Sequence, residues 1–354
     1  MLTSGCDVVW RLDHVQSGDE AWLAGYSHRK VIDLLPPDNG PLDAYPFPIV
    51  APVDAELAAA TRPDGHDLVV TAADGLSVMS YELEKYDPTG KLALWVNIPR
   101  LDGAVQLYLY YGGPPTTTDA SSTWSLDCVA VWHFSDTTLQ EARDSTANAQ
   151  HLEQIVPTNR PAIVAGLAGD ARSFFGGEDM DTVGIAYQPG LGAFSYSAWV
   201  MTSSLPSMVF EGVFYNGGTT TNDPGFDIER TSADWRSDLV DGLQSTRVQF
   251  SGSGTELLGR WVQLAGVVDR DLHTHIGYVD GVMRDSSDIA SLGKPDHDGH
   301  LTVGSLDGTR FYNGLIDELR IYSRAVPAAW FATERAVLTD PMRHVTIGPE
   351  QSAP

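Results

Sequence analysis

The acidic residue best placed for chemistry is Asp317, in a segment whose pattern predicts a β-strand. Between Leu315 and Tyr322, strict alternation puts Asp317 on one face with Leu315, Leu319 and Ile321. A carboxylate on an inward, apolar face must find hydrogen-bond donors or a cation. Calcium is a hard cation that accepts carboxylate and carbonyl oxygens. The pattern therefore predicts a structural calcium ion at Asp317, with capping of backbone amides as the alternative.

Carboxylate pairs suited to glycoside hydrolysis are a second kind of chemistry to test. Retaining glycosidases need two carboxyl groups roughly 5–5.5 Å apart, which one strand can present as Glu-x-Asp-x-Glu. No Glu in this sequence has Asp two positions later. Glu82 and Glu84 share a face, but their neighbours indicate an ordinary half-exposed strand, and His133, between two aromatic residues, is interpreted as structural. With no Gly-x-Ser-x-Gly or Gly-x-Gly-x-x-Gly motif, the sequence predicts a non-enzymatic protein.

Aromatic and amide side chains in turns suit sugar recognition, because rings stack on sugar faces and amides bind hydroxyl groups. The segment from Tyr215 to Asp241 is rich in Thr, Asn and Asp, and we expect it to form a variable surface loop. The candidate ligand-binding residues are Tyr215, Asn216, Asp223, Trp235, Tyr312 and Asn313.

The charge balance of the chain excludes some classes of binding partner. The chain has 354 residues, with 22 basic and 47 acidic side chains and a formal net charge of −25. Nucleic acids and anionic lipids both require clustered Lys and Arg, so neither is an expected partner. No apolar stretch reaches the ~18 residues of a membrane-spanning helix. A large excess of acidic residues is compatible with a soluble surface and with divalent cations.

Period-two alternation, interrupted by turn signals such as Asp-Gly and Asn-Gly, predicts an all-β chain of two antiparallel β-sandwich domains. We expect a polar lead-in over 1–20, a small sandwich over 21–113, a linker over 114–123, a second sandwich over 124–338 and an irregular tail over 339–354. The strands expected in the first domain are 28–34, 45–50, 67–71, 78–84, 92–98 and 105–110. Those expected in the second are 129–134, 194–201, 261–269, 275–280, 301–305 and 315–322, before a helix over 327–337.

Four blocks of the first domain resemble an uncharacterised bacterial domain-of-unknown-function family. They are Gly-Tyr-Ser-His-Arg-Lys at 25–30, Tyr-Glu-Leu-Glu-Lys-Tyr at 81–86, Leu-Trp-Val-Asn-Ile-Pro at 94–99 and Tyr-Leu-Tyr-Tyr-Gly at 108–112. The family strand usually has Trp-x-Tyr-Arg-Lys, so Ser-His before Arg-Lys is a departure. The resemblance covers about 90 residues.

The second domain resembles the laminin-G-like jelly roll of the concanavalin-A-like superfamily. The resemblance is carried by Val-Trp-His-Phe at 131–134, Tyr-Val-Asp-Gly at 278–281 and, most specifically, Phe-Tyr-Asn-Gly-Leu-Ile-Asp-Glu-Leu-Arg-Ile-Tyr at 311–322. It implies a jelly roll that binds glycans or other surface partners. It also implies that the Asp144 loop, or backbone oxygens near Gly176, join Asp317 around the calcium ion.

The two cysteines leave two interpretations open. Leu-Thr-Ser-Gly before Cys6 is similar to the end of a bacterial lipoprotein signal, which predicts lipidation of Cys6, although the basic and apolar parts of such a signal are missing. A disulfide between Cys6 and Cys128 is the alternative. The first interpretation predicts an outer-membrane lipoprotein with a lipid anchor.

These observations favour a secreted or cell-surface bacterial protein that binds or adheres to a glycan or a surface protein. A structural, homo-oligomeric subunit of an extracellular or envelope assembly is one alternative. A divergent polysaccharide-active enzyme is the other. Fold alone does not choose among them.

Overall fold

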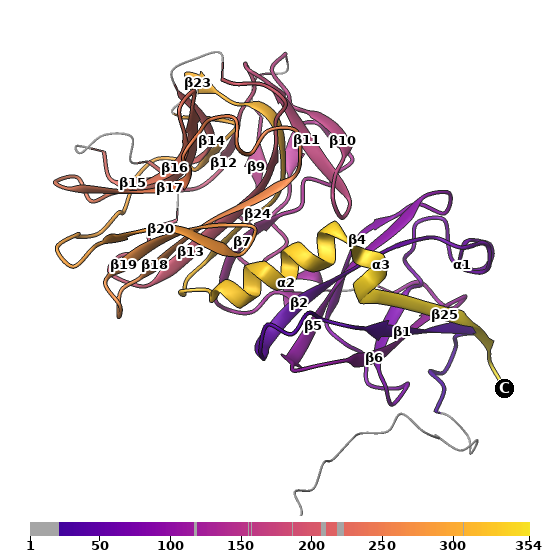
Figure 1. Ribbon diagram of the computed structural model, residues 1–354. Helices are drawn as coiled ribbons and strands as arrows, with labels where there is room; N and C mark the ends of the chain where they lie inside the picture. Colours follow the sequence, from indigo (N-terminus) through magenta and orange to yellow (C-terminus); the bar gives the residue numbers. More distant parts are fainter. Residues whose placement is uncertain are drawn as a thin grey trace, which may run out of the picture.

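The computed structural model describes residues 21–116, 119–154, 156, 158–185, 187–206, 210–217, 223–306 and 308–354. Cys6 lies outside these residues, so its lipidation and its disulfide with Cys128 stay predictions. Within the described part of the chain, nearly all regular structure is β, as expected. Figure 1 shows two sandwich domains with a helix between them.

The first domain consists of two small sheets. One has the strand order β25-β1-β6-β3 and the other β2-β5-β4. Their bounds are β1 His28–Leu34, β2 Leu42–Pro52, β3 Val69–Ala72, β4 Tyr81–Tyr86, β5 Lys91–Leu101, β6 Val105–Tyr111 and β25 Val345–Ser352, and helix α1 spans Ala55–Ala60. The Pro-rich strand β2 lies at a sheet edge, as predicted, where the missing N–H of proline costs no ladder bond.

The second domain is a sandwich of two larger sheets. We name the sheet that faces the first domain the docking sheet, with order β10-β11-β24-β13-β18-β19-β20 and β7 beside β24. Its strands are β7 Cys128–Trp132, β10 Ala162–Ala165, β11 Asp170–Phe175, β13 Phe194–Met201, β18 Val262–Asp269, β19 Thr274–Val279, β20 Val282–Asp288 and β24 Asn313–Tyr322.

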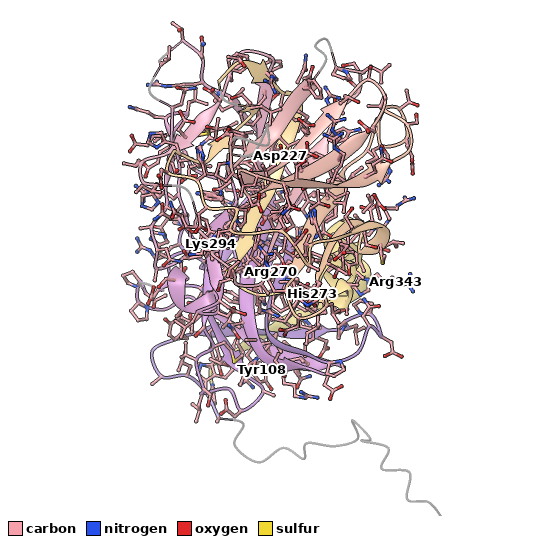
Figure 2. All side chains as sticks on the ribbon, turned by 90° about the vertical axis from the view of Figure 1, so that its left-hand side faces the viewer. Tyr108, Asp227, Arg270, His273, Lys294 and Arg343 are labelled. Atoms are coloured by element: carbon pink, nitrogen blue, oxygen red, sulfur yellow. The ribbon has the colours of Figure 1, made fainter. Side chains whose placement is uncertain are left out.

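The opposite sheet, named the outer sheet, has the order β17-β16-β15-β14-β21-β12-β9-β8, with β22 and β23 off this path. Its strands are β8 Glu141–Ala142, β9 Leu152–Glu153, β12 Met180–Thr182, β14 Phe210–Tyr215, β15 Gly225–Thr231, β16 Trp235–Val240, β17 Ser245–Ser251, β21 Thr302–Val303, β22 Ser305–Leu306 and β23 Arg310–Phe311. In Figure 2, Asp227 of this domain and Tyr108 of the first domain lie at opposite ends of the molecule.

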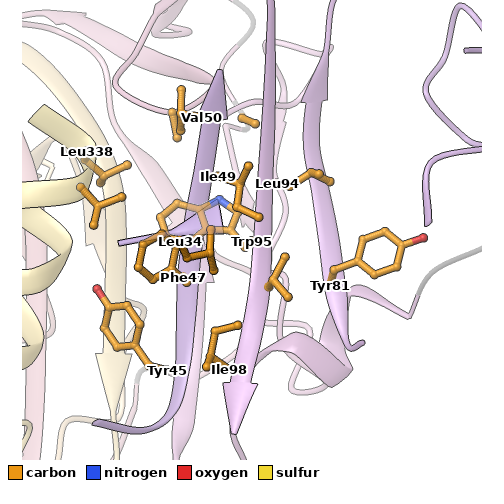
Figure 3. Packing of buried hydrophobic residues seen from close by; sticks show 14 of the residues in the cluster. Leu34, Tyr45, Phe47, Ile49, Val50, Tyr81, Leu94, Trp95, Ile98 and Leu338 are labelled. Atoms are coloured by element: carbon orange, nitrogen blue, oxygen red, sulfur yellow. The ribbon is translucent and has the colours of Figure 1, made fainter. Parts of the chain in front are cut away.

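The two domains share one hydrophobic core rather than meeting at a wet surface. Trp199 on the docking sheet and Phe331 on helix α2 belong to the same buried cluster as Phe47 and Leu94 of the first domain. Helix α2 spans Ala328–Thr339 and starts after Pro327, as predicted. Trp330 of α2 packs on Tyr45 with 4.8 Å between ring centroids, and Figure 3 shows Leu338 of this helix beside β2.

Two short segments complete the connection between the domains. Within the predicted linker, the 3-10 helix η1 (Ala120–Thr123) is fixed to the first domain, because Asn97 Nδ2 donates to Thr123 O at 2.9 Å. After α2, helix α3 (Pro341–His344) leads into β25. The expected irregular tail over 339–354 is therefore wrong. The segment from Val345 to Ser352 forms strand β25, which pairs antiparallel with β1 of the first domain.

Strand β24 contains a β-bulge that no sequence signal predicts. Ser197 of β13 pairs with Arg320 and Trp199 pairs with Asp317, so one residue of β13 faces two residues of β24. Glu318 has a φ of 51°, in the left-handed region that a bulge residue often adopts.

The bulge reverses the expected faces only in the part of β24 that precedes it, where Ile316 points into the sandwich core and Asp317 lies on the same side as Trp199, toward the first domain. Leu319 and Ile321 point into the sandwich core, whereas Glu318 and Arg320 face the first domain. The prediction that Asp317 shares a face with Leu319 and Ile321 is wrong, because the extra residue shifts the alternation by one.

Candidate functional site

An uncharged pocket opens at one side of the second sandwich, between β7 and β24 of the docking sheet and β12 of the outer sheet. It encloses about 590 Å³, within the range of small-molecule sites. The lining residues are Leu126, Val129, Ala130, Trp132, Asn148, Gln150, Thr182, Ile185, Tyr187, Gln188, Leu301 and Ile321. None of them is a carboxylate, an imidazole or a cation, so the pocket offers apolar surface and neutral hydrogen-bonding groups.

The floor of the pocket is rigid and its rim is exposed. Trp132 is buried, and its indole N–H donates to Gln150 O at 2.8 Å. Leu126 and Ile185 are among the exposed large apolar residues of the described chain. A preformed hollow surrounded by exposed apolar side chains is typical of a binding surface.

The wall that carries Tyr187 and Gln188 is held by Asn216, which follows β14 of the outer sheet, and by the loop that contains His297. Asn216 Nδ2 donates to Tyr187 O at 2.9 Å, and Gln188 Nε2 donates to His297 O at 3.0 Å. Burial and the nearby charge of Asp296 raise the pKa of Tyr187 to about 12. Its hydroxyl therefore stays neutral and can both donate and accept a hydrogen bond.

The predicted ligand-binding residues fall into two groups. Tyr215, Asn216 and Asp223 lie together behind this wall, where the Tyr215 hydroxyl donates to Asp223 and His297 Nδ1 lies 3.2 Å from the Asp223 carboxylate. Asn216 is fully buried, so it positions the pocket wall rather than meeting solvent.

The second group lies around a buried arginine. Trp235 and Tyr312 are fully buried, and the Arg230 guanidinium lies 5.4 and 5.1 Å from their ring centroids. Because neither ring reaches the surface, the expectation that they stack on a sugar is wrong. Asn313 begins β24 with an exposed side chain, and its backbone oxygen accepts a bond from Arg230 at 3.0 Å.

The expected surface loop over 215–241 is also wrong where the chain is described. It contains β15 and β16, which form a buried hairpin. Its polar residues pair across strands: Arg236 Nε lies 2.5 Å from Glu229, and Arg247 of the neighbouring strand β17 binds Asp238 through two bonds of 2.6 and 2.7 Å. Paired charges allow a polar sequence to be buried.

The three predicted calcium ligands are not gathered at one point. Asp144 already accepts bonds from the N–H groups of Val131, Thr146 and Gln150, which fixes the wall that carries Gln150. Gly176 follows Phe175, whose partner on β24 is Asn313, four residues before Asp317. At about 3.3 Å per residue this is a separation of about 13 Å along the strand. Calcium binding at Asp317 itself stays a prediction.

A buried charged cluster at the domain interface was not expected from the sequence. His133 Nδ1 lies 2.9 Å from Glu318, and its Nε2 lies 3.4 Å from Glu82 of β4. The ring stacks on Trp95 of β5 at 5.3 Å between centroids, with Trp124 at 5.4 Å on a tilted plane. The interpretation of His133 as a packed structural residue agrees with this position.

Glu82 and Glu84 are held in the same way. The Glu82 carboxylate accepts from the Trp124 indole at 2.7 Å and from Ser145 at 2.6 Å. The Glu84 carboxylate accepts from the Trp95 indole at 2.7 Å and from Ser135 at 2.6 Å. The strand as a whole is partly exposed, as expected, but the second domain covers these two carboxylates, which the sequence did not predict.

Electrostatics in the cluster favour a protonated imidazole. Burial alone would lower the pKa of His133, but the charges of Glu318 and of the two first-domain glutamates raise it well above its ordinary value. Burial raises the pKa of Glu84 to about 7, and the charge of Glu318 adds to the shift. Glu318 has a lowered pKa, because His133 and Arg320 outweigh the effect of its burial.

Arg320 extends the cluster to helix α2. Its guanidinium lies 2.5 Å from Glu318, binds Glu334 of α2, and lies 4.4 Å from the Trp95 ring centroid. Glu84, His133 and Glu318 are close enough to hold a metal ion. However, the carboxylate oxygens of Glu82, Glu84 and Glu318 already bind donors of the protein, so this cluster is an ion-pair network rather than a fitting metal centre.

No helix in the described residues is long and apolar enough to cross a membrane. No curated protein sequence matches the chain. Residues 175–331 match the family described as the concanavalin A-like lectin/glucanases superfamily. The match does not extend to the first domain, whose resemblance to the uncharacterised bacterial family stays a prediction.

Similar folds occur among solved structures of toxin domains. The binding domain of Paraclostridial Mosquitocidal Protein 1 is 15% identical, with a TM-score of 0.47 over 59% of this chain and 52% of that one. The botulinum neurotoxin serotype G binding domain is 14% identical, with a TM-score of 0.48 over 59% and 51%. The serotype D ligand-binding domain in complex with N-acetylneuraminic acid is 13% identical, with a TM-score of 0.46 over 59% and 50%.

The chain thus spans about half the length of these structures. The two antiparallel sheets of the second domain and the sequence match over 175–331 confirm the predicted concanavalin-A-like jelly roll.

Proposed function

We propose that the protein is a non-catalytic binding protein of the cell surface or extracellular space, and that it recognises an uncharged glycan in the pocket beside Tyr187. The observation that carries the proposal is the absence of charge from the described lining, in a chain of net charge −25. The matched family is named for lectins and glucanases, so its fold is compatible with sugar binding.

The chemistry of the pocket suits a sugar ring. Sugars present an apolar C–H face together with hydroxyl groups that need donors and acceptors. The pocket supplies an apolar floor around Trp132 and Ile321, and amides at Asn148, Gln150 and Gln188. The acidic surface of the protein repels sialylated, sulfated or uronic glycans, so neutral glycans are favoured.

The lining does not suit hydrolysis. General acid–base catalysis of glycoside cleavage needs a pair of carboxyl groups facing the scissile bond. The titratable group at the pocket is the Tyr187 phenol, whose raised pKa makes it a weak acid at neutral pH. These features support binding without turnover.

A glycan array that contains matched neutral and anionic glycans, read with calcium and with chelator, tests the proposal. We expect binding to neutral glycans only. Tyr187→Ala should then weaken the affinity about tenfold in titration calorimetry, since tenfold corresponds to about 1.4 kcal/mol. Phe175→Ala is the matched control, because this exposed aromatic residue lies outside the pocket.

Two results would count against the proposal. One is binding that prefers anionic glycans or is absent from the whole array in both buffers. The other is a neutral-glycan affinity that Tyr187→Ala leaves unchanged, which would place the binding site elsewhere.

A further inference from the structure

Another hollow lies in the first domain, beside the segment that links it to the second domain. It encloses about 380 Å³, which is also within the range of small-molecule sites. The body of the first domain contributes Tyr26 and Tyr81 (Figure 3) to its lining, and the predicted linker contributes Thr116, Asp119 and Ser122. We name this hollow the linker pocket. A ligand inside it contacts the first domain and the linker at the same time.

The walls of the linker pocket are fixed by backbone hydrogen bonds. On the side of the first domain, Met79 N donates to Val70 O at 2.9 Å. On the side of the linker, Thr116 N donates to His66 O at 2.6 Å. Because both walls are tied to neighbouring segments, the pocket is largely formed in the absence of a ligand, and binding costs little ordering of the chain.

The lining of the linker pocket carries a single charge among the described residues. Asp119 is exposed, and none of the other described lining residues is acidic or basic. Asp119 Oδ1 accepts the Ser121 N–H at 3.1 Å and the Ser121 hydroxyl at 2.6 Å, and so caps η1. Asp119 Oδ2 has no hydrogen-bond partner among the described residues, so this oxygen is available to a ligand.

Most of the remaining lining is apolar. Tyr26 and Tyr81 supply ring surface, and Met79 and Val78 supply alkyl surface. The Tyr81 hydroxyl already donates to Leu68 O at 2.5 Å. Burial raises the pKa of both phenols, so neither adds negative charge at neutral pH. The pocket therefore combines one carboxylate with a neutral, ring-lined interior.

This combination suits a ligand that has a positive head and an apolar body. An ammonium group forms charge-assisted hydrogen bonds with a carboxylate, and aromatic rings attract cations as well as apolar groups. The net charge of −25 on the chain raises the local concentration of cations and lowers that of anions. An anionic ligand would meet Asp119 without any basic side chain in the described lining to offset it.

We propose that the linker pocket binds a small organic cation, with its ammonium group on Asp119 and its apolar body against Tyr26 and Tyr81. This site is separate from the pocket beside Tyr187 and does not depend on the proposed glycan binding. Because the bound cation contacts the linker and the first domain together, it stabilises the arrangement in which η1 lies against β4.

A ligand-observed NMR titration of the full-length chain with matched probes tests the proposal. The probes are phenylbutylamine, phenylbutanol and phenylbutanoate, which share one apolar body and differ in the charge of the end group. At physiological salt we expect the amine to bind about fivefold more tightly than the alcohol, which is the gain typical of an exposed ion pair. The carboxylate should not bind.

Asp119→Asn removes the charge and keeps the shape of the site. Asparagine caps helices as well as aspartate does, so the variant should fold. It should bind the alcohol as the natural chain does and lose the preference for the amine. Asp38→Asn is the matched control, because Asp38 is an exposed aspartate of the same domain that lies outside the linker pocket, and this variant should keep the preference.

Val78→Arg locates the site independently of Asp119. Val78 lines the linker pocket and is 57% exposed, so the substitution should be tolerated by the fold. It places a positive charge beside the expected ammonium group, and we expect it to weaken amine binding about tenfold through repulsion between like charges.

Three outcomes would overturn the proposal. One is equal affinity of the natural chain for the amine and the alcohol. Another is the failure of all the probes to bind at millimolar concentration. The third is an amine preference that survives both Asp119→Asn and Val78→Arg, which would place the bound cation elsewhere on the acidic surface.

Discussion

The domain interface and the uncharged pocket beside Tyr187 use opposite chemistry within the same sandwich. At the interface, charged side chains such as Glu318 and Arg320 are fully buried, and protein donors already occupy the carboxylate oxygens of the ion-pair network. In the pocket, neutral amides and apolar side chains face a cavity that is open to solvent. The interface therefore serves to hold the domains together, whereas the pocket is suited to recognising a ligand. Satisfied charges fix two domains in one arrangement, whereas neutral groups in an open hollow remain available to a ligand.

The largest expected effect comes from breaking the interface network at Arg320. Arg320→Met leaves the buried carboxylate of Glu334 without its cation and that of Glu318 with His133 alone, and we expect a loss of about 3–5 kcal/mol in the free energy of unfolding. Urea unfolding measures it. Arg100→Met is the matched control, because Arg100 is 57% exposed in its ion pair with Asp43, and it should cost less than about 1 kcal/mol. Equal losses of unfolding free energy in the two variants would mean that the network does not hold the two domains together.

The pH dependence of stability is the next largest effect. Glu84 has a side chain that is 1% exposed and a pKa raised to about 7, so the folded state holds a proton that the unfolded state releases above about pH 4.5. Stability from this group is present at low pH and is lost as the pH rises through about 7. His133 acts in the same direction. Because its pKa is raised in the folded state, the stability from this group is present at pH values below its ordinary pKa and is lost at higher pH.

Unfolding free energies measured from pH 5 to pH 8 test this. We expect the natural chain to lose on the order of 3 kcal/mol over this range through Glu84, and Glu84→Gln to flatten the curve. Glu153→Gln removes an exposed carboxylate and should follow the natural chain. A Glu84→Gln curve as steep as that of the natural chain would assign the pH dependence to other groups.

The smallest effect on stability is expected at the pocket rim. Leu126 is exposed and lines the cavity, so Leu126→Ser should change the free energy of unfolding by less than about 0.5 kcal/mol. The same substitution should weaken glycan binding in calorimetry, because it removes apolar contact area from the rim. If Leu126→Ser lowered the stability but left glycan binding unchanged, the pocket rim would contribute to folding rather than to recognition.

Alternation along single strands was enough to locate most of the fold. The segments 28–34 and 194–201 were predicted as strands, and they form β1 and β13 with the same bounds. Strand β25 was missed, because Gly348 and Pro349 interrupt a short apolar run that becomes a strand only beside β1. Its pairing is a tertiary effect that no local pattern encodes.

The site residues were predicted less well, for two physical reasons. The Glu318 bulge has no glycine to announce it, so the faces of β24 were assigned by strict alternation. The burial of Glu84 comes from the docking of the second domain, which single-strand patterns do not report. One signal was available: Trp95 lies on the face of β5 opposite Leu94 and Val96, so both faces of this strand are apolar. A strand that is apolar on both faces indicates a cover on each side.

Strand β25 gives the chain an order of events during synthesis. The first domain's sheet β25-β1-β6-β3 draws its edge strand from residues 345–352, which leave the ribosome after the whole second domain. Until then β1 has an unpaired edge, at which a neighbouring nascent chain can add a strand. The second domain can complete its two sheets from its own strands before residues 345–352 are made. Thus the domain that is made first is completed last, and a chain truncated before Val345 lacks the edge strand of its first sheet.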